Sequence, residues 1–290
     1  MSIAIDDLDY LTFFPTFDNE KNLSWNGRVV SLKAVKCPLL PRGFANIAKD
    51  KISHDLHLFK PSKTFLTEGI RDHHLRIGAI NGMNTTLDEA MSNASYIQQF
   101  ASNKCIEYVY NQTHGVVVDA LEVLALNFRG NSPYTSKELL ANWTEFHQEN
   151  EGSPNAKYFQ CCHSQGALHV RNALIKAPKE IRDRIIVVAI APAAIVPKAL
   201  CFASYNYACK NDLIPHAELI YLGGLARNGL CAPSLFKSVI DNHNELILLD
   251  PHPEENDTHH FQARTYAERI EFHVDDYLHR NGEYEPIRKV

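Results

Sequence analysis

The 290-residue sequence has little of what would place it in several large classes of protein. It carries no block of like charge, and its formal net charge is −5, whereas general nucleic-acid-binding proteins are usually basic. Its longest apolar run, from Ile185 to Val196, has only about a dozen residues and contains a proline, so it is too short to span a membrane. We therefore expect no nucleic-acid partner and no transmembrane segment.

Cysteine pairing and an export signal are also missing. The seven cysteines form no C-x-x-C pair, and the adjacent Cys161 and Cys162 lie in an apolar stretch that predicts a buried strand. Buried free cysteine behaves as a small hydrophobic residue, and reducing compartments keep thiols reduced, so we expect seven free thiols. The first residues lack the basic start and clean apolar stretch of a signal peptide. The sequence thus predicts a cytoplasmic protein, or one exported without a cleavable signal peptide.

What the sequence does contain is an alternation of strand and helix patterns from about residue 76. The predicted strands cover 77–80, 105–110, 157–162, 185–191, 201–208 and 245–249. The predicted helices cover 87–101, 116–128, 139–146 and 165–176, and a last helix begins near 261. A Thr-x-x-Glu capping box stands before two of them, at 86–89 and 135–138.

This alternation indicates the class of fold. Strands that alternate with helices predict a mostly parallel sheet with helices on both faces, an α/β fold, over residues 76–290. With 45% hydrophobic residues the chain can build a proper core. Residues 1–75 are less regular, and we expect this N-terminal segment to pack on the core or to lead into it. Short strands are expected there at 29–32 and 39–41.

One short motif predicts chemistry. The sequence CHSQG at 162–166 directly follows a predicted apolar strand and runs directly into a predicted helix. This context is typical of the nucleophile elbow of α/β-hydrolases, in which a strained turn lifts a serine hydroxyl above the sheet. Ser164 is therefore the expected nucleophile. Gly166 meets the need for a small residue where strand and helix approach, and Cys162 replaces the usual first glycine with a residue that is still small.

The same turn indicates where negative charge would be stabilised. The dipole and N-terminal amides of the helix that starts at Gln165 favour an anion, so the Gln165 N–H is one expected oxyanion-hole donor. The second donor in this fold comes from a loop after an earlier strand. The loop at 81–83 is the candidate, with the Met83 N–H directed at the site and Gly82 keeping the backbone approach open.

A serine nucleophile needs a histidine to take its proton and a carboxylate to orient that histidine. In this fold the carboxylate follows the serine along the chain and precedes the histidine. Asp212 is the expected acid, because it lies in NDLIP at 211–215, just after a predicted strand. Asp241 and Asp250 are weaker rivals.

The base is expected in the loop between the last strand and the last helix. His259 occupies the place just before the final helix and is the preferred base, with the neighbouring His260 as the alternative and His252 third. The loop also holds residues that could ligate a metal: His252, Glu254, Glu255, Asp257, His259 and His260. Their spacing matches no zinc pattern, so we expect no metal and no cofactor.

Several separated segments carry a family resemblance. They are INGMNT (80–85), YNQTHG (110–115), CHSQGALHVRNAL (162–174), VVAIAPAAIV (187–196) and NDLIP (211–215). Together they resemble an uncharacterised family of α/β-hydrolase-like proteins from chlamydiae, over roughly residues 75–280. The resemblance implies a bacterial protein with the α/β-hydrolase fold and a Ser164–Asp212–His259 triad, and it supplies no substrate.

The sequence as a whole predicts a serine hydrolase. We expect it to cleave a carboxylic ester, lipid or small-molecule, through an acyl-enzyme intermediate, as an esterase or lipase does. This substrate class rests on analogy at the level of the fold. The alternative is a catalytically silent binding or effector module with a protein partner. Thioester or amide hydrolysis on the same scaffold is a third reading.

Overall fold

The structure is a computed structural model that describes residues 63–111, 135–216 and 233–285, together with three short strands nearer the N-terminus. These three strands are β1 (Thr16–Phe17), β2 (Asn22–Trp25) and β3 (Arg28–Ser31), and they form an antiparallel sheet in that order. The strand expected at 29–32 corresponds to β3. The strand expected at 39–41 and the helix expected at 116–128 lie outside the described residues.

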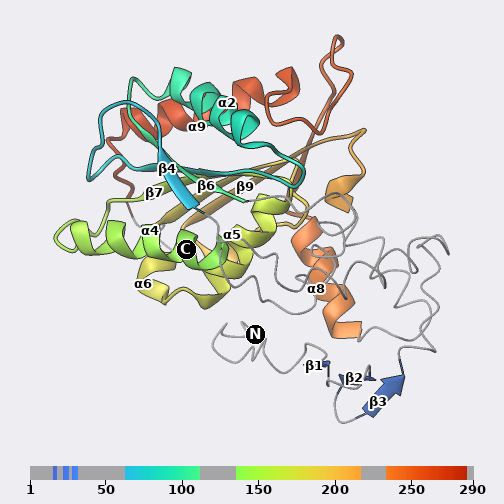
Figure 1. The fold of residues 1–290 in the computed structure, drawn as a ribbon. Helices are drawn as coiled ribbons and strands as arrows, with labels where there is room; N and C mark the ends of the chain where they lie inside the picture. The colour runs from blue at the N-terminus through green and yellow to red at the C-terminus, as the bar shows by residue number, and fades with distance from the viewer. Residues whose placement is uncertain are drawn as a thin grey trace.

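A seven-stranded sheet lies at the centre of the molecule, in the order β10-β9-β8-β7-β5-β6-β4 (Figure 1). Its strands are β4 (Lys63–Leu66), β5 (Ile77–Ile80), β6 (Ile106–Tyr110), β7 (Tyr158–His163), β8 (Ile185–Ile190), β9 (Ala203–Cys209) and β10 (Leu246–Leu249). Every neighbouring pair is parallel except β4 with β6. The predicted class, α/β with a mostly parallel sheet, is confirmed.

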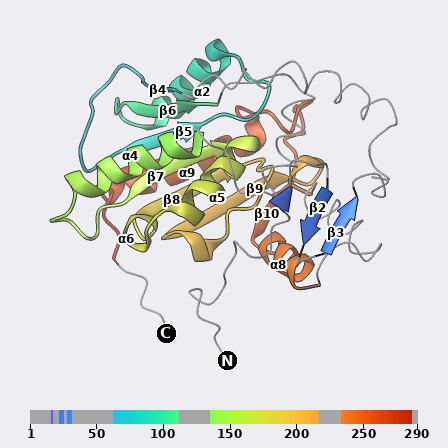
Figure 2. The same cartoon turned by 60° about the horizontal axis from the view of Figure 1, so that its bottom comes forward.

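Helices cover both faces of this sheet, as Figures 1 and 2 show. On one face lie α2 (Leu87–Phe100) and α9 (Arg264–His279). On the other lie α4 (Thr135–Glu149), α5 (Gln165–Lys176) and the short α6 (Lys179–Arg182). The sequence did not predict α6 or α8 (Pro233–His243). In the described parts of the chain, no helix has both the length and the apolar character needed to cross a bilayer.

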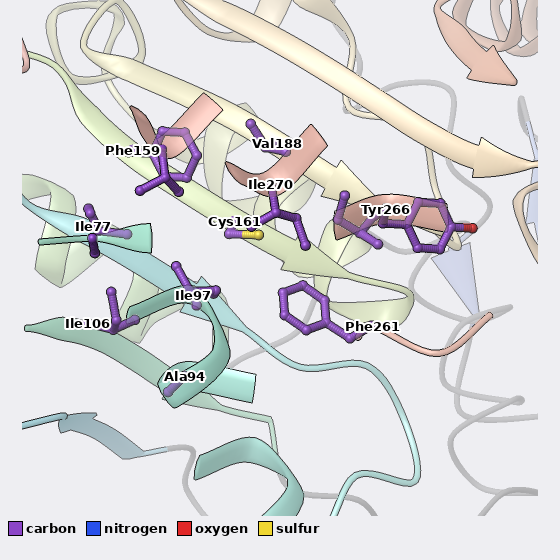
Figure 3. Packing of buried hydrophobic residues seen from close by; sticks show 14 of the residues in the cluster. Ile77, Ala94, Ile97, Ile106, Phe159, Cys161, Val188, Phe261, Tyr266 and Ile270 are labelled. Atoms are coloured by element: carbon purple, nitrogen blue, oxygen red, sulfur yellow. The ribbon is translucent and has the colours of Figure 1, made fainter. Parts of the chain in front are cut away.

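The core has two halves because strand side chains alternate between the two faces of the sheet. Phe159 and Cys161 of β7 point to the face covered by α2 and α9, where they pack with Ile97 and Ile270 (Figure 3). Tyr158 and Cys162 of the same strand belong to the other half, with Trp143 of α4 and Val170 of α5. The central strand β7 is thus buried on both sides, as the apolar run before CHSQG predicted.

The start of α2 follows the local sequence signal. The Thr86 hydroxyl accepts the Glu89 N–H at 3.2 Å, while the Glu89 carboxylate accepts the Thr86 N–H at 2.7 Å. This capping box was predicted from the sequence and is confirmed. At the second predicted box, α4 begins at Thr135 itself, and Glu138 accepts a hydrogen bond from Thr64 Oγ1 on the edge strand β4.

The sheet begins upstream of residue 76, where the alternation was expected to start. β4 is its edge strand, and its pairing with β6 runs antiparallel. Its four residues, KTFL, lack the continuous apolar run of the central parallel strands, and Leu66 is half exposed. That weak local pattern is the reason that the sequence did not predict it.

Candidate active site

Ser164 lies at the tight turn between β7 and α5. Its backbone adopts φ 49° and ψ −121°, a conformation that costs energy in any residue other than glycine. Hydrogen bonds to the end of β8 and the residues after it hold this turn: the Ser164 N–H donates to Ile190 O at 3.2 Å, and Ser164 O accepts the Ala193 N–H at 3.0 Å. The strained strand–turn–helix that the CHSQG motif predicted is therefore present.

Two glycines allow the close approaches that this turn requires. A Cβ atom at Gly166 would lie 2.8 Å from Asn81 O and 3.0 Å from Ile80 O, which are backbone atoms at the end of β5. A Cβ atom at Gly82 would lie 2.7 Å from Ser164 Cβ. Contacts this short do not occur between real Cβ atoms and such neighbours, so both positions need glycine. Cys162, which stands in place of the first motif glycine, is fully buried.

His259 lies within hydrogen-bonding distance of the other two predicted side chains, Ser164 and Asp212. His259 Nε2 is 2.9 Å from Ser164 Oγ, and His259 Nδ1 is 2.6 Å from Asp212 Oδ2. An ionised carboxylate only accepts, so Nδ1 carries the proton and Nε2 presents its lone pair to the serine hydroxyl. The imidazole is thereby set in the tautomer that can take a proton from Ser164.

Asp212 is buried at the end of β9. Its Oδ1 accepts the Ile214 N–H at 3.0 Å, and only 3% of its side chain is exposed. The rival acids lie elsewhere: Asp250 is 82% exposed and pairs with Lys210, and Asp241 is exposed on α8.

The loop that carries His259 uses its other polar side chains to hold its own shape. His260 is exposed, and its Nδ1 accepts the Gln262 N–H. His252 Nδ1 accepts the Glu254 N–H, and Asp257 accepts the His259 N–H at 3.0 Å. Of the two neighbouring histidines, the structure thus brings His259 and not His260 to Ser164. In the described residues, no three His, Cys, Asp or Glu side chains gather as metal ligands.

The predicted oxyanion donors lie on the segments that meet at Ser164. Gln165 is the first residue of α5, and its side-chain oxygen accepts a hydrogen bond from Asn111 Nδ2 at 2.8 Å. Asn81 ties the loop after β5 to the end of β6, because it donates to Asn111 O at 2.7 Å and accepts the Asn111 N–H at 2.8 Å. Met83 follows in this loop. The donor roles of the Gln165 and Met83 N–H groups stay predictions.

Sequence reasoning assigned no role to Asn81, Asn111 or His163. His163 is the residue directly before the nucleophile, and its Nε2 lies 2.7 Å from the carbonyl oxygen of His259. Burial, and then the proximity of His259, lower the pKa of His163 to about 3, so this imidazole is neutral at physiological pH. Its position inside the motif was the signal that could have pointed to it.

Several solved structures are similar to this chain at low sequence identity. The carboxylesterase of Bacillus cereus is 14% identical, with a TM-score of 0.41, and the match covers 78% of this chain and 99% of that one. Dienelactone hydrolase from Anabaena variabilis is 12% identical, with a TM-score of 0.43 and coverage of 75% and 91%. The poly(3-hydroxybutyrate) depolymerase LpqC from Bordetella parapertussis is 10% identical, with a TM-score of 0.44 and coverage of 80% and 88%. No curated protein matches the chain.

A family model matches more than half of the chain. The family described as "Protein of unknown function (DUF687)" matches residues 59–214, more than half of the chain. The matched range includes β4 to β9 and the elbow at Ser164. The parallel sheet with its antiparallel edge strand and its serine elbow has the predicted α/β-hydrolase fold. By the extent of the match, the chain belongs to the family of proteins of unknown function DUF687.

Proposed function

We propose that this protein is a serine hydrolase that cleaves a carboxylic ester through an acyl-enzyme intermediate. One observation carries the proposal. Ser164 Oγ, the His259 ring and the Asp212 carboxylate form one hydrogen-bonded chain, with distances of 2.9 Å and 2.6 Å. The strained backbone of Ser164 supports it further, because strain persists where the surrounding structure requires it and often marks a functional site.

In the proposed acylation, Ser164 Oγ attacks the ester carbonyl carbon while its proton passes to His259 Nε2. Asp212 stabilises the imidazolium that results. When the bond to the leaving alcohol breaks, His259 returns the proton to the alkoxide oxygen, and the alcohol departs. Water then repeats the sequence: it loses a proton to His259, attacks the acyl carbon, and releases the acid as Ser164 regains its proton. No step uses a cofactor.

The developing oxyanion would be stabilised by the N–H groups of Gln165 and Met83. The N-terminal end of α5 carries a partial positive charge, and a donor aimed at the oxyanion contributes on the order of 3 kcal/mol in such sites. The Gly82 backbone is close enough to Ser164 that an added Cβ atom would lie 3.3 Å from the hydroxyl oxygen. This proximity supports a donor from the same loop.

A fluorophosphonate probe, which labels activated serines, tests this function. We expect the wild-type protein to be labelled and both Ser164→Ala and His259→Ala to lose labelling. His260→Ala is the matched control: it removes the neighbouring exposed imidazole and should be labelled like the wild type. Asp212→Asn should lower the rate of labelling by about 10⁴-fold, because an amide favours the wrong imidazole tautomer. Asp250→Asn should leave the rate of labelling unchanged.

Folded wild-type protein that resists the probe would contradict the proposal and favour the catalytically silent module. Labelling that survives Ser164→Ala would show that a different residue reacts. If labelling is lost as expected, a panel of p-nitrophenyl esters of increasing acyl length will define the substrate class. Short-chain preference indicates an esterase, and long-chain preference a lipase-like enzyme.

A further inference from the structure

His259 stands in an irregular loop between β10 and α9, and 31% of its side chain is exposed. A base on such a loop must nevertheless keep its ring in line with both the nucleophile and the acid. Two side chains, one partly buried and one fully buried, contact the backbone on either side of this residue. They are His163, on the nucleophile elbow, and Tyr266, in the first turns of α9.

His163 reaches the loop from the side of the nucleophile. A carbonyl oxygen only accepts, so the 2.7 Å contact with His259 O requires a proton on His163 Nε2. The two imidazole rings lie 5.2 Å apart between centroids. His163 Nδ1 is buried and has no hydrogen-bond partner among the described residues. The single strong polar contact of this ring is therefore the bond to the peptide of the base.

Tyr266 reaches the loop from the side of the acid. Its hydroxyl donates to Thr258 O at 2.8 Å and accepts the Cys209 N–H at 2.9 Å. Cys209 ends β9, and the turn that follows leads directly to Asp212, whose N–H bonds Cys209 O. Figure 3 shows the Tyr266 ring at one end of the core cluster, with its hydroxyl directed away from the other labelled side chains. One hydroxyl thus joins the strand of the acid to the loop of the base.

We propose that His163 and Tyr266 are positioning residues, which hold the Thr258–His259 backbone between the nucleophile elbow and the acid strand. The inference rests on the proposed function, because it assigns these side chains to the alignment of that reaction. Neither side chain touches the reacting atoms. Their effect comes through geometry: a displacement of about 1 Å in a reacting group can cost on the order of a hundred-fold in rate.

The same helix provides a matched control. Tyr277 of α9 is fully buried like Tyr266, and its hydroxyl also contacts backbone carbonyls, those of Lys157 at 2.8 Å and Arg76 at 3.1 Å. Those contacts lie at the start of β7 and just before β5, at the opposite end of the sheet from Ser164. Loss of the Tyr277 hydroxyl therefore removes comparable buried hydrogen bonds without touching the proposed site.

The experiment compares Tyr266→Phe with Tyr277→Phe in the hydrolysis of p-nitrophenyl acetate and in fluorophosphonate labelling. We expect Tyr266→Phe to lower kcat by about ten- to a hundred-fold while KM stays within about two-fold, since the loss is in alignment and not in binding. Tyr277→Phe should keep wild-type kcat even where it lowers the melting temperature. Circular dichroism and thermal melting establish that each variant is folded at the assay temperature.

The second part of the experiment replaces His163 by Gln or by Met, two side chains of similar length. Gln keeps an N–H donor near the position of Nε2, whereas Met keeps the bulk and removes the donor. We expect His163→Met to lower kcat and labelling about ten-fold or more and His163→Gln to restore most of the rate. If His163→Met does not fold, the Tyr266 and Tyr277 pair still decides the inference.

The outcomes separate the inference from the function on which it rests. If the wild type reacts and both Tyr266→Phe and His163→Met keep wild-type kcat, the positioning roles are wrong and the hydrolase stands. Equal losses in Tyr266→Phe and Tyr277→Phe would show a general stability effect and overturn the inference too. A folded wild type that neither hydrolyses esters nor labels contradicts the proposed function, and the positioning roles fall with it.

Discussion

At the scale of single residues, the site depends on how closely main chain can approach Ser164. The serine has a positive φ of 49°, and the Gly82 backbone, in the loop after β5, lies so close that an added Cβ atom would be 2.7 Å from Ser164 Cβ. Gly82 fills this contact without a side chain. His163 Nδ1 would also lie 3.0 Å from a Cβ atom at Gly82. A single methyl group at position 82 therefore tests whether the reactivity of Ser164 depends on this close backbone approach.

We expect Gly82→Ala to slow fluorophosphonate labelling by about ten-fold or more, because the new methyl group must displace Ser164 or the loop that carries Met83. Gly152→Ala is the control, since a Cβ atom there would meet nothing within 4 Å. The second-order rate constant of labelling is the measurement. Wild-type labelling by Gly82→Ala would show that the loop can move away from Ser164 at no cost.

At the scale of elements, a buried charge cluster joins the two strands β5 and β6 to helix α4. Arg76, which precedes β5, is 2% exposed and lies 2.7 Å from Glu107 of β6, which is equally buried. It also lies 2.7 Å and 2.8 Å from Glu149 and Glu145 of α4. Hydrogen bonds and charge attraction from Glu107 outweigh the cost of burial and raise the pKa of Arg76, so the guanidinium is always charged.

Removal of this cation should destabilise the fold strongly. We expect Arg76→Met to lower the free energy of unfolding by about 3–5 kcal/mol, because the buried Glu107 would lose its closest cation, at 2.7 Å, and keep only the more distant and partly exposed Arg71 at 3.6 Å. Arg71→Met is the matched variant: Arg71 contacts Glu145 and Glu107, but 40% of its side chain is exposed. An exposed pair contributes about 0–1 kcal/mol. Urea unfolding measures both, and equal losses would contradict this reading.

At the scale of the whole molecule, stability depends on pH through neutral histidines whose side chains are buried or partly buried. Burial lowers the pKa of His163 to about 3 and those of His169 and His273 to about 4, all below the ordinary value near 6.5. The unfolded chain therefore binds protons that the folded chain excludes. The stability that these residues contribute is complete above about pH 6.5 and is lost as the pH falls toward 4.

His169 is the clearest case, because it is fully buried in α5 and neither ring nitrogen has a hydrogen-bond partner among the described residues. We expect its protonation to remove on the order of 3 kcal/mol of stability between neutral pH and about pH 4. His169→Leu should be folded at neutral pH and should show a smaller loss of melting temperature on acidification. His279→Leu, an exposed position, should follow the wild type. A His169→Leu protein as acid-sensitive as the wild type would exclude this cause.

What the sequence by itself determined is what neighbours along the chain encode. The capping box of Thr86 and Glu89, the strand into CHSQG and the helix from Gln165 all depend on residues a few positions apart, so they could be predicted before any contact was known. Chain order in the fold also led to His259, which the structure brings to Ser164, and to Asp212, which it brings to His259. The roles of these side chains stay predictions until the labelling experiment is done.

Only the tertiary structure decided what depends on segments far apart in the sequence. β4 has a weak strand pattern and lies in the sheet because β6 pairs with it. The sequence preferred His259 but left its neighbour His260 open as an alternative, and the direction of the loop brings the His259 ring to Ser164 and leaves His260 exposed. The bonds of His163 and Tyr266 to the Thr258–His259 backbone follow from the same packing. Contacts of this kind arise from the folding of the whole chain, which no local pattern encodes.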